Sequence, residues 1–94
     1  MEAREAREAY RARMRTPLAE LPPLVRELVE IGRTGSFIQS DGRCDERTVE
    51  IGKQLYSSGG RDAMLYAHEE VSYWLPREAR ALEFAWDGIG GWQH

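Results

Sequence analysis

Proline and glycine divide this chain into short segments, and the apolar residues within these segments recur at helical spacing. The dividing residues are Pro17, Pro22, Pro23, Gly35, Gly59, Gly60, Pro76 and Gly88. The segment 36–42 has only two apolar residues among turn formers, so it is expected to form a loop or a very short extended piece. The sequence therefore predicts an all-α fold, a small bundle of four to five short helices.

Residues 2–15 form the most strongly predicted helix, because helix formers dominate, with glutamates early and arginines late. Its apolar stripe is narrow and consists of Ala3, Ala6, Tyr10 and Met14. Little apolar surface is available to hold this helix on a core, and prolines follow it. Two arrangements of segment 1–15 follow: it packs on its own domain through Tyr10 and Met14, or it projects and pairs with a second chain, which the prolines after it favour. A single helical domain, 16–94, is expected to follow.

Three further helices are expected in the first part of that domain. The first starts at the proline pair 22–23 and ends with Gly32 or Gly35 in the left-handed conformation. The next two run from about 45 to 57 and from about 62 to 75, with a Ser-Ser-Gly-Gly run between them. Their apolar residues are spaced so that each helix has one buried face.

A last helix is expected to start at Pro76 and to end at Gly88, after which Ile89 would fold back onto Phe84. The tail that follows ends in a second tryptophan, and its burial would add a large apolar contribution to a small core. Two interpretations follow. Trp86 and Trp92 belong to the core, or they form an aromatic anchor for a partner.

Two short motifs mark the second half of the chain, Gly-Gly-x-x-x-Met at 59–64 and Trp-Asp-Gly-Ile-Gly-x-Trp at 86–92. Through them the segment 51–92 resembles short uncharacterised bacterial helical proteins. The resemblance implies no activity, and no functional residue follows from it. The first motif lacks the Gly-Lys-Ser/Thr ending of a phosphate-binding loop, so it is interpreted as a helix stop and a turn.

Composition and charge restrict the classes of function. Hydrophobic residues make up 41% and charged residues 31% of 94 residues, which is typical of one globular domain. No apolar run approaches the roughly 20 residues of a membrane span, and no secretory signal opens the chain. We therefore expect a cytosolic protein without a membrane partner. The net charge of −3 argues against a general nucleic-acid surface.

The single cysteine, Cys44, excludes an internal disulfide and is the one candidate for thiol chemistry. It lies just before a predicted helix, where backbone N–H groups and two arginines, Arg43 and Arg47, would favour a thiolate. Asp45 and Glu46 oppose this effect. A reactive thiol is therefore an alternative hypothesis, and an inert cysteine is the simpler one.

Metal ligands do not form a recognisable set. His68 has no second ligand four residues away, and Glu46 and Glu50 alone are too few for a di-metal site in a bundle. We expect no metal and no cofactor. The most economical hypothesis is a non-enzymatic helical interaction module that self-associates, with a dimer or another protein as partner. The alternatives are a thiol-based regulatory or enzymatic protein using Cys44, and a DNA-associated regulator using the arginines of segment 1–15.

Overall fold

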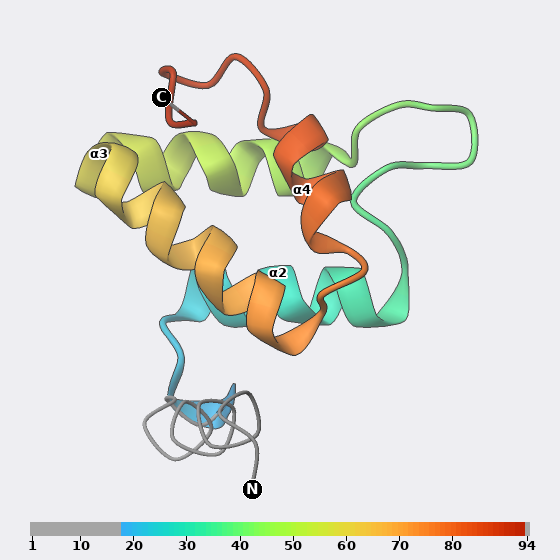
Figure 1. The fold of residues 1–94 in the computed structure, drawn as a ribbon, viewed down its shortest axis with the longest axis horizontal. Coiled ribbons are helices and arrows are strands. Elements are labelled where there is room, and N and C mark those ends of the chain that lie inside the picture. The colour runs from blue at the N-terminus through green and yellow to red at the C-terminus, as the bar shows by residue number, and fades with distance from the viewer. Residues whose placement is uncertain (1–17, 94) are drawn as a thin grey trace, which may run out of the picture.

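The computed structural model describes residues 18–93, and the fold they form is all-α, as predicted. A short 3₁₀ helix, η1 (Leu18–Glu20), precedes three α-helices, α2 (Pro23–Thr34), α3 (Glu46–Trp74) and α4 (Ala79–Ala85) (Figure 1). The only β-type pairing in this part of the chain is an isolated bridge between Ile38 and Cys44. The predicted helix over 2–15, with Ala3, Ala6, Tyr10 and Met14, lies outside the described residues.

Helix α3 is bent at Gly60, where φ is 65° and ψ is −153°. The bend separates a first arm, 46–59, from a second arm, 61–74, and the second arm runs back at an angle to the first, so that the two arms diverge from the bend (Figure 1). These arms correspond to the two helices expected in this region, so the described residues contain three α-helices rather than the four that the sequence predicts there. The serines before the glycine pair do not end the helix, because only Gly60 leaves the helical conformation.

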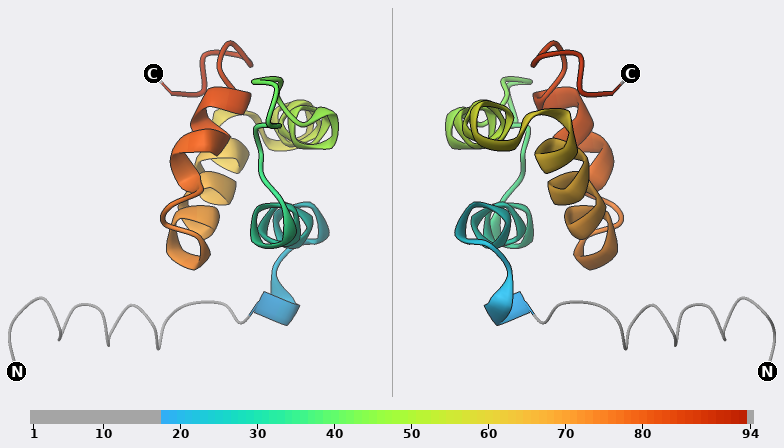
Figure 2. Two further views of the ribbon diagram at one scale, coloured as in Figure 1. Left: turned by 90° about the vertical axis from the view of Figure 1, so that its right-hand side faces the viewer. Right: turned by 90° about the vertical axis from the view of Figure 1, so that its left-hand side faces the viewer.

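The helices are arranged in two pairs. In Figure 2, α2 and the first arm of α3 are seen nearly end-on, one above the other, while α4 lies beside the second arm. The buried apolar side chains of the described residues form one core cluster. The fully buried ones are Val25, Leu28, Val29, Phe37, Ile51, Met64, Val71, Leu82 and Trp86. Burial of each such side chain contributes about 1.5–3 kcal/mol relative to exposure, so these residues hold the fold together.

The ends of the helices follow local chemistry. Asp45 caps α3, because its Oδ2 accepts hydrogen bonds from the backbone N of Thr48 at 3.0 Å and from its Oγ1 at 2.9 Å. Helix α2 ends differently from the prediction: Gly35 has φ −152°, and Gly32 lies inside the helix, so neither is left-handed. Gly88, after α4, does take the predicted left-handed conformation, with φ 85°.

None of the helices in 18–93 is both long and apolar enough to cross a membrane, and the cytosolic location stays a prediction.

Candidate interaction surface

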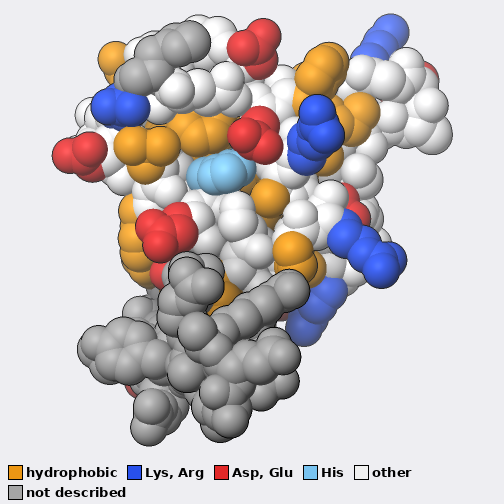
Figure 3. Space-filling model, viewed as in Figure 1, with side chains coloured by type: hydrophobic (Ala, Val, Ile, Leu, Met, Phe, Trp, Pro, Cys, Tyr) orange, Lys and Arg blue, Asp and Glu red, His pale blue; other side chains and the backbone are white. Residues whose placement is uncertain are grey.

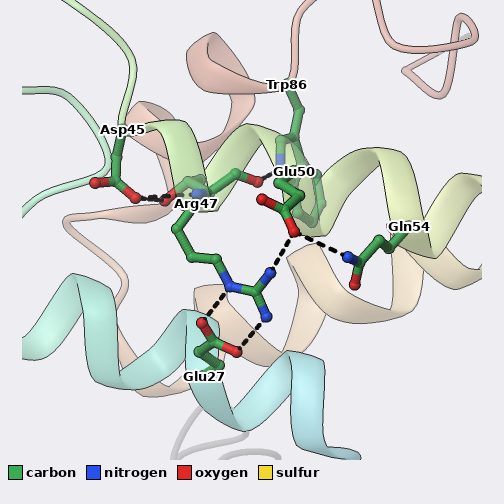
Figure 4. Close-up of polar contacts among 7 residues, drawn as sticks. Glu27, Asp45, Arg47, Glu50, Gln54 and Trp86 are labelled. Atoms are coloured by element: carbon green, nitrogen blue, oxygen red, sulfur yellow. Dashed lines mark hydrogen bonds and ion pairs between the residues drawn. The ribbon is translucent and has the colours of Figure 1, made fainter.

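An ion-pair cluster joins α2 to the first arm of α3 (Figure 4). The guanidinium of Arg47 donates to both carboxylate oxygens of Glu27, at 2.5 and 2.8 Å, and a third N–H donates to Glu50 at 2.8 Å. These hydrogen bonds lower the pKa of the Glu27 carboxyl below its ordinary value. Arg47 is thus fully engaged with carboxylates, and the cluster acts as a clamp between helices rather than as a site for a ligand.

The two tryptophans of the tail are part of the core. Trp86 is 0% and Trp92 2% exposed, and their rings meet edge to face at 5.4 Å between centroids. Each indole N–H is satisfied by the backbone, that of Trp86 by the carbonyl of Thr48 at 2.9 Å and that of Trp92 by the carbonyl of Trp86 at 3.0 Å. This burial corrects the idea of an aromatic anchor, because neither ring offers surface to a partner.

Close approach to the backbone of α3 positions Trp86. A Cβ at Gly52 would lie 2.5 Å from the indole nitrogen of Trp86, so only glycine leaves room for this ring. Farther along, Arg61 on the second arm donates to the carbonyl of Trp92 at 3.0 Å and fastens the tail. The tail as far as Trp92 is therefore built into the domain, beside α4.

Next to the tail, His68 on α3 faces Glu83 on α4. The Nε2 atom of His68 lies 3.7 Å from Oε2 of Glu83, and the imidazole packs against Trp92 at 5.4 Å between centroids. Nε2 is buried and has no hydrogen-bond partner, whereas Glu83 is 45% exposed on its side chain. Within residues 18–93 no three potential ligands come together, so His68, Glu46 and Glu50 do not form a metal site.

The outer face of α4 carries the most exposed aromatic residue of the described chain. Phe84 is 66% exposed, and it lines a shallow hollow with Arg80, Glu83, Asp87 and Gln93. The expected fold-back of Ile89 does not cover the ring: Ile89 packs against the core, and its N–H bonds to the carbonyl of Trp86. A hydrophobic centre in a charged rim is typical of a protein contact surface. We call these five residues the α4 patch.

Cys44 is a half-buried free thiol that packs against the core. The arginines expected to favour its thiolate are directed elsewhere, since Arg43 pairs with Asp41 at 3.5 Å and Arg47 with Glu27. The carboxylate of Asp45 caps α3. No contact in the described chain therefore supports an activated thiol.

On the face of the described residues shown in Figure 3, basic side chains do not gather into a broad surface. They are spread singly or in pairs among acidic and hydrophobic side chains. The arginines of segment 1–15, on which the DNA hypothesis depends, lie outside the described residues.

Sequence reasoning missed two features, the α4 patch and the Glu27–Arg47 pair. The sequence carries a weak signal for the α4 patch, because Arg80, Phe84 and Asp87 recur at helical spacing opposite the apolar positions Ala79 and Leu82. It carries no local signal for the Glu27–Arg47 pair, because these two residues are 20 positions apart in the chain.

No protein-family model, curated protein or solved structure matches the chain. The resemblance to short bacterial helical proteins therefore stays a prediction.

Proposed function

We propose that this chain is a small helical interaction module that self-associates, and that its contact surface includes the α4 patch. The observation that carries the proposal is the 66% exposure of Phe84 at the centre of charged side chains. The core does not use this ring, because the inner side of α4 is filled by Ala79, Leu82, Ala85 and Trp86. An aromatic side chain that packing leaves free is the residue type that most often anchors an interface.

A second copy of the chain is the partner that the patch fits best. The patch carries both signs of charge, Arg80 on one side of Phe84 and Asp87 on the other. A surface that contacts its own copy must be self-complementary, and a patch with paired opposite charges around an apolar centre meets that requirement.

The segment 1–15 gives a further reason to expect self-association. Residues 1–17 contain five arginines and three glutamates, a net charge of +2, whereas residues 18–93 carry a net charge of −5. In our proposal a projecting helix with the stripe Ala3, Ala6, Tyr10 and Met14 extends the contact onto the acidic domain of the second copy. The larger contact would strengthen a dimer that the α4 patch alone holds weakly.

Sedimentation equilibrium of the full chain over a range of concentrations tests the proposal. We expect a mass that rises from monomer toward dimer, and Phe84→Ser should weaken the association about tenfold or more, the scale of a hot-spot residue. Thermal unfolding of the variant serves as control, because a surface substitution should change stability by less than about 0.5 kcal/mol. A full chain that is monomeric at the highest concentration would overturn the proposal.

A further inference from the structure

The side chains of the α4 patch form a polarised stripe along the outside of the helix. Arg80, Phe84 and Asp87 follow one another at spacings of four and three residues and are all exposed. Arg80 and Phe84 lie about one turn apart on α4. Asp87 follows in the turn after the helix, where its N–H bonds to the carbonyl of Phe84 at 3.3 Å, and all three residues line the same hollow. The row therefore begins with a positive charge, has an aromatic ring near its middle and ends with a negative charge.

We infer that two copies of the chain pair by laying these stripes against each other in antiparallel orientation, about a two-fold axis beside Phe84. This inference rests on the proposed self-association and adds its geometry. In this arrangement Arg80 faces the partner's Asp87, Asp87 faces the partner's Arg80, and the two phenyl rings meet near the axis. Both ion pairs form at once, because an isologous contact repeats every interaction.

The charges select this orientation over the parallel one. A parallel pair would place Arg80 against the partner's Arg80 and Asp87 against the partner's Asp87, and like charges directly opposite each other repel. The antiparallel pair replaces both repulsions by attractions. The midpoint between positions 80 and 87 falls between Glu83 and Phe84, so the ring lies close to the axis where a contact is best shielded from water.

Glu83 does not oppose this arrangement. Its carboxylate is directed to the side of the stripe, toward His68 on α3, and its backbone carbonyl accepts a hydrogen bond from the side chain of Gln93 at 3.3 Å. The arrangement thus avoids placing two carboxylates on the axis.

The patch is small, so the dimer is dynamic. Stable interfaces use about 20–30 residues a side, many more than the α4 patch provides. Exchange between monomer and dimer should therefore be rapid, and the association should depend on salt, because its orientation is set by charges near the surface.

A mixing experiment tests the geometry. Arg80→Glu places two acidic residues opposite each other in a homodimer, and Asp87→Arg places two arginines opposite each other. We expect each variant alone to dimerise about tenfold more weakly than the wild type, by like-charge repulsion at two symmetric contacts. An equimolar mixture of the two variants restores attraction at both contacts, so it should form a heterodimer of about wild-type affinity.

Lys53→Glu serves as the matched control, because it makes the same change of charge on an exposed residue of the first arm of α3. It should dimerise like the wild type. Its heterodimer with D87R keeps one attractive and one repulsive contact, so it should be weaker than the heterodimer of R80E with D87R. A mixture of R80E and D87R that associates no better than either variant alone would overturn the antiparallel arrangement, while wild-type dimers would still support self-association. A wild-type chain that remains monomeric would overturn both.

Discussion

At the scale of single residues, two arginines of this protein have different surroundings. Each of the three guanidinium nitrogens of Arg47 donates to a carboxylate of α2 or α3, whereas Arg80 has no ion-pair partner within 4.0 Å among the described residues and lies at the surface. The sequence places the start of a helix near Asp45 and favours burial of the tryptophans, and the structure has both features. Local sequence rules do not predict the exposure of Phe84, because which face of a helix is covered depends on elements distant in sequence.

The Glu27–Arg47 pair should make stability depend on pH. The pKa of Glu27 is lowered from its ordinary 4.5 by the hydrogen bonds of Arg47, so the folded chain keeps this carboxylate ionised to lower pH than the unfolded chain does. The stabilisation is therefore complete above pH 4.5 and is lost as the pH falls through the folded-state pKa. We expect Glu27→Gln to lower the thermal midpoint at pH 7 but to leave it nearly unchanged at pH 2.

Thermal melts of wild type and variant at several pH values check this expectation. The control is Glu69→Gln, an exposed residue of the second arm of α3, which should have little effect at any pH. A gap between wild type and E27Q that is as large at pH 2 as at pH 7 would show that the carboxylate does not stabilise the fold through its charge.

At the scale of elements, the bend at Gly60 places the two arms of α3 in different helix pairs. The first arm lies next to α2, and the second arm lies next to α4. The Ser-Ser-Gly-Gly run signals an interruption in the sequence, but it does not say whether the helix stops or bends. Serine is tolerated in helices, so the helix continues to Gly59. The direction of the second arm depends on where Met64, Ala67 and Val71 are buried, and this information is not local.

Gly60 should therefore be sensitive to substitution. Its φ of 65° and ψ of −153° lie in a region that is nearly restricted to glycine, while a Cβ would meet nothing within 4 Å. The cost of Gly60→Ala is thus one of backbone strain rather than of collision, about 1–3 kcal/mol of unfolding free energy. Urea denaturation measures it, with Ser57→Ala as a control on the exposed helical surface. A loss below about 0.5 kcal/mol, the range of ordinary surface changes, would mean that the bend does not require glycine.

At the scale of the whole molecule, the outer face of α4 stays exposed, and its central side chain, Phe84, does not pack in the core. The tryptophans of the tail hold the inner side of α4 against α3, so Arg80 and Phe84 on its outer side and Asp87 in the turn after it stay exposed in one packed framework. A preorganised surface binds with less loss of conformational entropy than a mobile one. The fold class could be predicted from the spacing of apolar residues. The contact surface could not, because it is defined by what the rest of the chain does not cover.

The most direct test of the central claim is a dilution series of ¹H–¹⁵N correlation spectra of the full chain, from about 1 mM to about 20 µM, a range that spans weak affinities. We expect concentration-dependent chemical shifts that centre on residues 80–87 and extend to their neighbours on the second arm of α3 and to residues 1–15 where these join the contact. Spectra that do not change with concentration, or that change only on α2 and the first arm of α3, would contradict it.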